Sequence, residues 1–192
     1  MSEAVLENGF AKVESGTWLV GSSQPAAVLG KSVPLSLKGW FVPDRSRLSL
    51  IKLEGTAALS DAQRPFLTRI PCAAPLTVVS AKVLVAPEEA RRSGYVMRVI
   101  PFSFRNSVCV TEFDSEWVVM STSSRVTSFT VAEGELLTVR LESAVAWTTR
   151  RPTGYCPVLR LRDAIIPRRR DRNLMLHFYG PGIVWVEGSN AS

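Results

Sequence analysis

The chain has 192 residues, of which 46% are hydrophobic and 21% charged, and its formal net charge is +6. This length suits one domain or two closely packed halves, and this composition is that of a globular protein able to bury a core. No stretch approaches the roughly 18 apolar residues of a transmembrane helix. The acidic first residues resemble neither a signal peptide nor an Arg-rich transit peptide, so we expect a cytoplasmic protein, or a mitochondrial one if the source is eukaryotic.

Helical periodicity is nearly absent, and the sequence predicts only short helices. They are expected in AVLENGF (4–10), in LSDAQRPF (59–66) and in PEEARRSG (87–94). The last begins with Pro and acidic residues and stops at Gly94, as a helix of one or two turns does. It also marks the predicted boundary between an N-terminal β half, residues 1–90, and a C-terminal β half, residues 91–192. The alternative is one continuous domain.

Strand signals fill the rest of the chain. Stretches rich in β-branched and aromatic residues predict strands at 96–104, 107–113, 116–121, 125–131, 136–143, 144–149, 158–166, 174–180 and 182–188. Several alternate with a period of two, which places one set of side chains in the core and the other in solvent. The alternating sets are Val126, Ser128 and Thr130 against Thr127, Phe129 and Val131, and Leu137, Val139 and Leu141 against Thr138, Arg140 and Glu142. This pattern is typical of an all-β sandwich or barrel.

A short motif, a tryptophan in an apolar run followed by glycine or serine, occurs three times. The three copies of this tryptophan motif are SGTWLVGSS (15–23), DSEWVVMSTSS (114–124) and GPGIVWVEGSNAS (180–192). A Gly-led alternating strand follows the first two copies. Because one hairpin cannot bury its apolar face alone, repeated strand–turn–strand units predict a pseudo-symmetric β-sandwich; the alternative is chance similarity. We expect Trp18, Trp117 and Trp185 to be buried, although exposed tryptophans could stack on bases.

Two stretches resemble a known family. GELLTVRLESAVAWTT (134–149) and LHFYGPGIVWVEGS (176–189) are similar to signatures of the family named for altered inheritance of mitochondria, also called the mitochondrial biogenesis family. The resemblance covers about the last 85 residues. It implies a β-sandwich related to the tryptophan RNA-binding attenuator protein, built from pseudo-repeats and often trimeric. No enzymatic activity is established for that family, and its fungal member is linked to organisation of the mitochondrial inner membrane.

The residues that most often carry metal or nucleophilic chemistry are few. Cys72, Cys109 and Cys156 are widely spaced, which fits neither a disulfide framework nor a zinc site. His177 is the only histidine, and the chain has no G-x-S-x-G motif to supply a nucleophile beside it. We therefore expect His177 to be a structural strand residue, with Leu174, Leu176 and Phe178 on the opposite face. No metal and no other cofactor is expected.

The acids of TEFDSEW alternate along one predicted strand, so Glu112, Asp114 and Glu116 are expected to share a face. Such a row could bind Ca²⁺ or act as an acid/base pair. The favoured interpretation is the solvated face of an edge strand, where charge also opposes aggregation. Gly180, Pro181 and Gly182 lack the Lys-Ser/Thr and helix of a phosphate loop, and we interpret them as a β-turn.

Arginines concentrate between residues 150 and 172. Clustered Arg can neutralise the phosphates of RNA or of anionic lipids, whereas the plainer interpretation is a solvated turn with local ion pairs. The candidate anion-binding residues are Arg150, Arg151, Arg160, Arg162, Arg168, Arg169, Arg170 and Arg172.

Three functions remain open from the sequence. We favour a non-enzymatic β-sandwich scaffold or binding protein that forms a homo-oligomer, in which the partner covers exposed strand edges. The family resemblance implies that this oligomer is a trimer. The alternative is an RNA-binding or anionic-lipid-binding protein that uses the arginines of 150–172. An enzyme with an unrecognised site around His177 or the three acids is the third.

Overall fold

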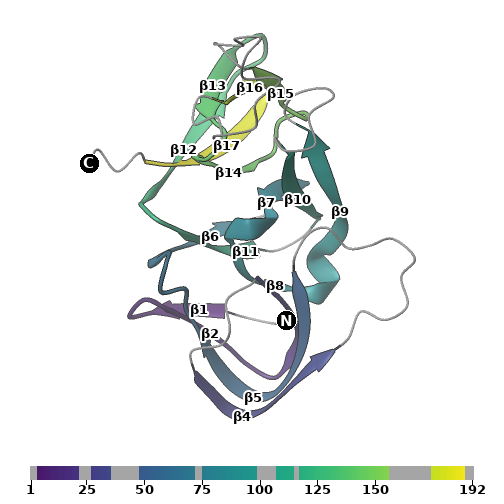
Figure 1. Ribbon diagram of the computed structural model, residues 1–192, viewed down its shortest axis with the longest axis vertical. Coiled ribbons are helices and arrows are strands. Elements are labelled where there is room, and N and C mark those ends of the chain that lie inside the picture. The colour runs from purple at the N-terminus through teal and green to yellow at the C-terminus, as the bar shows by residue number, and fades with distance from the viewer. Residues whose placement is uncertain are drawn as a thin grey trace, which may run out of the picture.

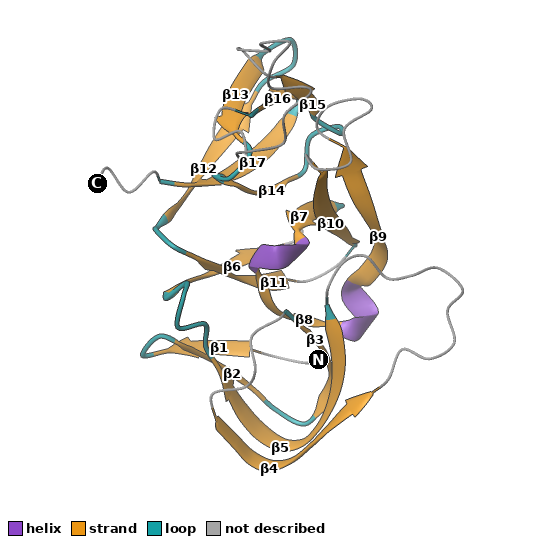
Figure 2. Cartoon of the chain, viewed as in Figure 1, coloured by secondary structure: helices purple, strands orange, loops and turns teal. Residues whose placement is uncertain are grey.

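The computed structural model describes residues 4–21, 27–35, 48–71, 75–98, 107–114, 117–155 and 174–188. These residues form an all-β protein in which strands dominate (Figure 2) and pair antiparallel within three sheets. The prediction of an all-β fold with few short helices is confirmed. None of the helices in the described ranges is long and apolar enough to cross a membrane.

Sheet A is the largest, with eight strands in the order β1–β2–β5–β3–β8–β11–β6 and β4 on the outer edge of β5. The first half of the long β5 pairs with β3 and its second half with β2, and the sheet curves back on itself at the lower end of Figure 1. Its strands are β1 (Ala4–Glu7), β2 (Phe10–Val13), β3 (Gly16–Val20), β4 (Ala27–Leu35), β5 (Ser49–Leu59), β6 (Phe66–Pro71), β8 (Val83–Pro87) and β11 (Trp117–Thr122).

Sheet B has six strands in the order β12–β17–β14–β7–β10–β9, and sheet C has three in the order β13–β16–β15. Sheets A and B each combine strands from before and after residue 90, so their hydrogen bonds cross the predicted boundary between the halves. The strands of sheet B are β7 (Leu76–Val79), β9 (Arg91–Arg98), β10 (Ser107–Phe113), β12 (Val126–Val131), β14 (Ala144–Trp147) and β17 (Gly182–Glu187). Those of sheet C are β13 (Leu136–Arg140), β15 (Thr153–Tyr155) and β16 (Met175–Tyr179).

The three sheets form layers along the long axis of the molecule, with sheet C at the top, sheet B in the middle and the curved sheet A below (Figure 1). Buried side chains fill each space. One cluster, which includes Met97, Trp147 and Phe178, lies between sheets B and C. A second, which includes Ile70 and Phe113, lies between sheets A and B. The third lies within the curve of sheet A. Both faces of the central strands β8, β11 and β14 are thus covered, and every residue of these three strands is buried.

Two of the three helix predictions are wrong, and the third is correct only in part. Residues 4–10 form the β1–β2 hairpin, whose turn residues Asn8 and Gly9 have φ angles of 49° and 79°. This conformation is the one that an Asn-Gly hairpin turn requires. The stretch around Asp61 is a turn, in which the Asp61 carboxylate accepts a hydrogen bond from the Gln63 N–H at 3.0 Å.

The third predicted helix is a single 3₁₀ turn, η2 (Glu88–Ala90), and β9 begins directly afterwards. A second 3₁₀ turn, η1 (Ser80–Lys82), links β7 to β8 and was not indicated by the sequence. Most predicted strands of the C-terminal half are present with small shifts at their ends. The strand predicted at 96–104 corresponds to β9, which already begins at Arg91, and residues 99–104 lie outside the described residues. The strand predicted at 158–166 lies outside the described residues.

The predicted alternation of buried and exposed residues holds for β16 but is wrong for β12. On β16, Leu176 and Phe178 are fully buried whereas Met175 and His177 are half-buried. On β12, residues 127–130 are all exposed, and only Val131 is buried. The reason is the position of β12 at the end of sheet B, where it has a neighbouring strand on one side only among the described strands.

The three tryptophan motifs form the strands β3, β11 and β17, but these strands do not belong to one sheet. Trp18 on β3 and Trp117 on β11 are buried in the same cluster, on strands that flank β8. Trp185 lies on β17 of sheet B and is half-buried against the cluster between sheets A and B. Burial is therefore confirmed for Trp18 and Trp117 and partial for Trp185.

Candidate functional site

The described residues contain a shallow groove of 410 Å³ between sheets B and C. Its walls are β12 and β17 on one side and β13 and β16 on the other, and we call it the B–C groove. Apolar side chains line its length, and threonines and single charged groups lie among them. The apolar residues are Phe129, Leu137, Val139, Met175 and Val186. Such a lining suits a protein segment or an amphipathic molecule.

Glu187 lies at one end of the groove and forms a buried ion pair with Lys82. The Lys82 Nζ is 2.7 Å from Glu187 Oε1, and the two side chains are only 11% and 12% exposed. Nζ also donates to the backbone carbonyls of Glu142, at 2.6 Å, and Ala144, at 3.0 Å. The second carboxylate oxygen of Glu187 accepts the Ser123 N–H at 3.1 Å. All three ammonium protons therefore have acceptors, which makes the pair a structural link.

This hydrogen-bond network links sheets A and B through residues that are far apart in the sequence. Lys82 comes from η1 beside β8 of sheet A, whereas Glu187 ends β17 of sheet B, 105 residues later. Burial lowers the pKa of the Lys82 ammonium below its usual 10.5, and the Glu187 carboxylate opposes this shift. The buried ion pair between Lys82 and Glu187 therefore fixes sheet A relative to sheet B.

A second polar cluster lies on the face of sheet B that points toward sheet C. Glu112 on β10 is directly opposite Thr77 on β7 and Ser93 on β9, and the Ser93 hydroxyl donates to its carboxylate at 2.7 Å. The Arg151 guanidinium lies 5.4 Å from the centre of the Tyr95 ring. Burial first, and then Glu112, raise the pKa of the Tyr95 phenol above its usual 10.0, while Arg151 acts in the opposite direction.

This cluster unites two groups that the sequence treated separately, one acid of the TEFDSEW row and one arginine of the 150–172 region. Glu112 and Arg151 both interact electrostatically with the Tyr95 side chain. Because the Arg151 guanidinium lies over the Tyr95 ring, it holds the chain between β14 and β15 against β9. Arg150 is exposed. The remaining candidate arginines lie outside the described residues, namely Arg160, Arg162, Arg168, Arg169, Arg170 and Arg172.

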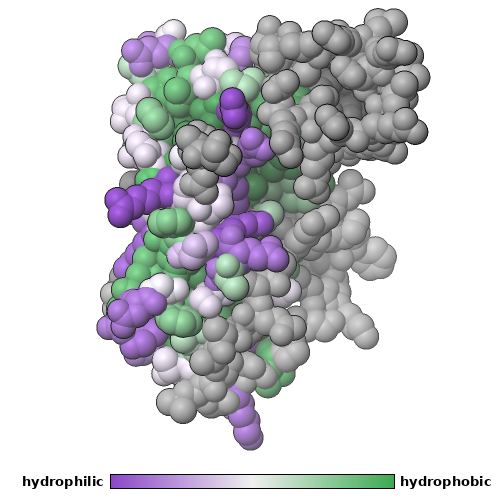
Figure 3. All heavy atoms as spheres, turned by 60° about the vertical axis from the view of Figure 1, so that its left-hand side comes forward, coloured by the Kyte–Doolittle hydropathy of each residue, from purple (hydrophilic) through white to green (hydrophobic). Residues whose placement is uncertain are grey.

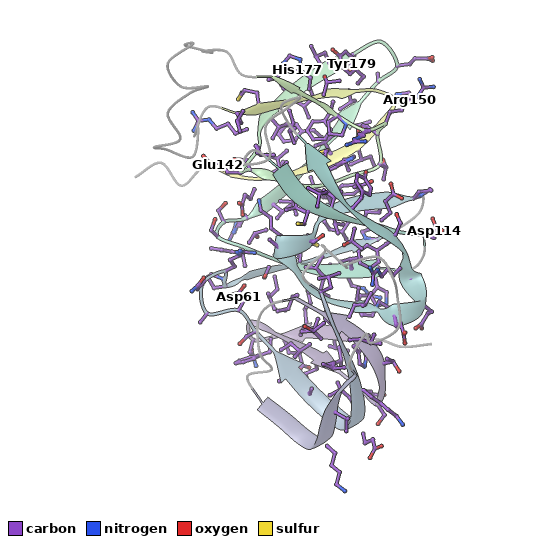
Figure 4. All side chains as sticks on the ribbon, turned by 45° about the vertical axis from the view of Figure 1, so that its right-hand side comes forward. Asp61, Asp114, Glu142, Arg150, His177 and Tyr179 are labelled. Atoms are coloured by element: carbon purple, nitrogen blue, oxygen red, sulfur yellow. The ribbon has the colours of Figure 1, made fainter. Side chains whose placement is uncertain are left out.

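The other predicted site residues do not converge. Figure 4 shows His177 and Tyr179 at the upper end of the molecule, on sheet C, far from Asp114 at mid-height. His177 is half-buried on β16, opposite Thr138 and Thr153. Asp114 is exposed just after β10, and Glu116 lies outside the described residues. Within the described part of the chain, no group of three or more His, Cys, Asp or Glu residues is arranged to hold a metal ion.

The Gly-Pro-Gly stretch is a packing turn between β16 and β17, as the sequence predicts. Gly180 lies against the backbone of the β12–β13 turn, where an added Cβ would be 1.9 Å from the Ala132 carbonyl oxygen. Its N–H donates to the Glu135 carbonyl at 3.2 Å. Cys109 is a half-buried free thiol, and Cys72 and Cys156 lie outside the described residues.

The fold is shared with protein SPYM3_0169 from Streptococcus pyogenes, which is known from an X-ray crystal structure. The match has a TM-score of 0.72 at 12% sequence identity and covers 99% of this chain and 94% of that chain. A likeness at this identity shows the fold alone. No protein-family model matches the sequence, and no curated protein matches it.

Sequence reasoning did not anticipate the Lys82–Glu187 pair or the B–C groove. Lys82 stands alone among small and apolar residues, and Glu187 lies within the third tryptophan motif, whose pattern indicates packing only. A lysine within a run of buried residues is the one available signal, because a lysine is rarely buried without a partner. The identity of its partner depends on the pairing of distant strands.

Proposed function

We propose that this protein is a non-enzymatic β scaffold that binds other protein chains and assembles as a homo-oligomer. The observation that carries the proposal is the position of its exposed large apolar side chains, most of which lie on the outer strands of the sheets. They are Val5 and Leu6 on β1, Val33 on β4, Phe66 on β6, Phe129 on β12 and Leu136 on β13.

Outer strands carry unpaired backbone N–H and C=O groups, and apolar side chains beside them favour contact with another chain. In Figure 3, hydrophobic residues gather at the upper end of the molecule, over the region of β12 and β13. Leu136 is 51% exposed and lies directly opposite the exposed Tyr179 on sheet C. The resemblance to the mitochondrial biogenesis family supports a scaffold role and implies a trimer.

The native mass tests the proposal most simply. Multi-angle light scattering over a concentration series should give a multiple of the 21.1 kDa chain mass. A mass of one chain at every concentration would contradict self-assembly. The Leu136→Lys variant, with Thr138→Lys as an exposed control on the same strand, would then show whether the patch on sheet C contributes.

A second candidate function is binding of anionic ligands, either RNA or anionic lipid, through the arginines of 150–172. The exposed Arg150 supports it, since Arg151 beside it is stacked on Tyr95 and fixes this part of the chain. Binding to RNA and to cardiolipin-containing vesicles should weaken as salt rises and should fall in the Arg168→Ala/Arg169→Ala/Arg170→Ala variant. Binding curves that show no response with either ligand would reject this function.

A further inference from the structure

Strand β12 has an unusual outer edge. Among the described strands it pairs only with β17, so its other edge faces outward. Residues 127–130 are exposed, and Phe129 is 44% exposed. The sequence of β12, VTSFTV, contains neither charge nor proline, which are the usual features that prevent an edge strand from pairing with another chain. The strand therefore offers an open template for a further strand.

The hydrogen bond after the end of β17 shows which backbone groups point outward. The Gly188 N–H donates to the Arg125 carbonyl at 3.1 Å, so residue 125 and every second residue after it face β17. The backbone groups of Val126, Ser128 and Thr130 consequently point away from sheet B. A strand added at this edge would bond to these three residues.

Charges at the two ends of β12 are of opposite sign. The exposed Arg125 precedes the strand, and the exposed Glu133 and Glu135 follow it in the turn to β13. Parallel pairing of two copies would place like charges together, whereas antiparallel pairing would place each arginine beside the acidic turn of the other chain. The edge is thus complementary to itself only in the antiparallel sense.

We propose that β12 pairs antiparallel with β12 of a second copy, across a two-fold axis at Phe129, and joins the two B sheets into one. The inference rests on the proposed homo-oligomer and names its interface. In this register Ser128 pairs with Thr130 of the partner subunit, so outward-facing residues meet outward-facing residues. Arg125 is then opposite Glu133 of the partner subunit. The interface is two-fold, in contrast to the trimer that the family resemblance implies, and the native mass distinguishes them.

Cross-linking tests the register. Phe129 would meet Phe129 of the partner subunit as a non-hydrogen-bonded pair, with Cα atoms about 4.5 Å apart, which suits a disulfide. The Phe129→Cys variant should form a covalent dimer under mild oxidation. The matched control is Thr127→Cys on the same face, which is opposite Val131 of the partner subunit and should stay monomeric on a denaturing gel. Equal cross-linking of the two variants, or none in Phe129→Cys, would overturn the register.

Proline at position 128 tests the edge without disturbing the sheet, because the Ser128 N–H points outward and makes no bond to β17. Ser128→Pro should lower the native mass from twice 21.1 kDa to that of one chain, while Ser128→Ala remains dimeric. A Ser128→Pro protein that is still a dimer would overturn the proposal.

Charge exchange gives a test in which the strand sequence is unchanged. Within one chain Arg125 and Glu133 are about 25 Å apart along the strand and cannot pair, so any coupling between them is between chains. Arg125→Glu and Glu133→Arg should each raise the dimer dissociation constant about tenfold, and the double exchange should restore it. Effects that simply add would overturn the pairing.

The outcomes separate this inference from the proposed function. A wild-type chain that is monomeric at every concentration contradicts both. A wild-type trimer that is unchanged by Ser128→Pro, with no Phe129→Cys dimer, overturns the β12 interface and leaves the homo-oligomeric scaffold in place.

Discussion

The indole ring of Trp18 on β3 packs against that of Trp117 on β11, with ring centroids 5.8 Å apart and planes tilted by 39°. The two rings meet on the inner face of sheet A, over the strand β8 that separates their own strands. Trp18 Nε1 donates to the Glu14 carbonyl at 2.9 Å, and the Arg69 guanidinium lies 5.1 Å from the Trp117 ring. Residues 99 positions apart in the chain thus form the centre of the lower core.

Truncation of either ring should strongly destabilise the protein. Trp18→Ala should cost about 3–5 kcal/mol of unfolding free energy, since it removes a fully buried aromatic side chain and leaves a cavity. Urea unfolding followed by circular dichroism measures the change. Phe66→Ala, at an exposed position on sheet A, is the control and should have a much smaller effect. Similar losses for the two variants would contradict the packing described here.

Removing one member of the Lys82–Glu187 pair should be costly, because the other charge stays buried. Glu187→Gln and Lys82→Met should each lower the unfolding free energy by about 3–5 kcal/mol. The double variant Lys82→Met/Glu187→Leu should lose less than the sum of its parts. Lys12→Met, which breaks the exposed Lys12–Glu7 pair, should change little. Additive losses at Lys82 and Glu187 would mean that the two groups are not coupled.

The pH dependence of stability should show the lowered pKa of Lys82. Between that pKa and 10.5, the usual value in the unfolded chain, the unfolded state binds more protons than the folded state. The unfolding free energy contributed by Lys82 therefore rises as the pH rises through this window. The difference between wild type and Lys82→Met, measured by urea unfolding at several pH values, should grow toward pH 10.5. A difference that shrinks would indicate a raised pKa. Taking this difference cancels the contribution of Tyr95, whose raised pKa has the opposite sign.

Gly180→Ala should be poorly tolerated, because the new methyl group would meet the backbone of the β12–β13 turn at 1.9 Å. Overpacking of this kind costs at least about 1–3 kcal/mol. The control is Gly134→Ala, which has a φ of 81° but no atom within 4 Å of the added Cβ. It should cost about 1–2 kcal/mol, the penalty of the left-handed conformation alone. A larger loss at Gly134 than at Gly180 in thermal unfolding would contradict close contact at the Gly-Pro-Gly turn.

Much of the fold was predictable, because strand signals depend on local sequence. The alternating residues of β16 and the β-branched run of β11 have the burial that their patterns indicate. The interpretation of the acid row as the solvated face of an edge strand is wrong for Glu112, because β10 lies between β7 and β9 and this side chain is half-buried. AVLENGF was misread as a helix although Asn8-Gly9 is a strong hairpin signal, since a short apolar run fits either structure. The exposed β12 was misread because alternation does not reveal which strand ends a sheet.

The candidate sites were much less predictable than the strands. Glu112 and Arg151 approach the same tyrosine only because β7, β10 and β9 are adjacent and in register. Lys82 and Glu187 meet only because β17 joins sheet B beside β14. The order of strands in a sheet depends on packing between residues that are far apart in the sequence. A local pattern in a single sequence does not reveal this order.

Hydrogen exchange at single amides of β12 tests the central claim, assembly through this strand, most directly. The account predicts that Ser128 and Thr130 amides become more protected as the chain concentration rises, because their N–H groups bond to the partner subunit. Thr127 and Phe129, which face the adjacent strand, should be protected at all concentrations. Rapid exchange at Ser128 and Thr130 that does not depend on concentration would contradict the account.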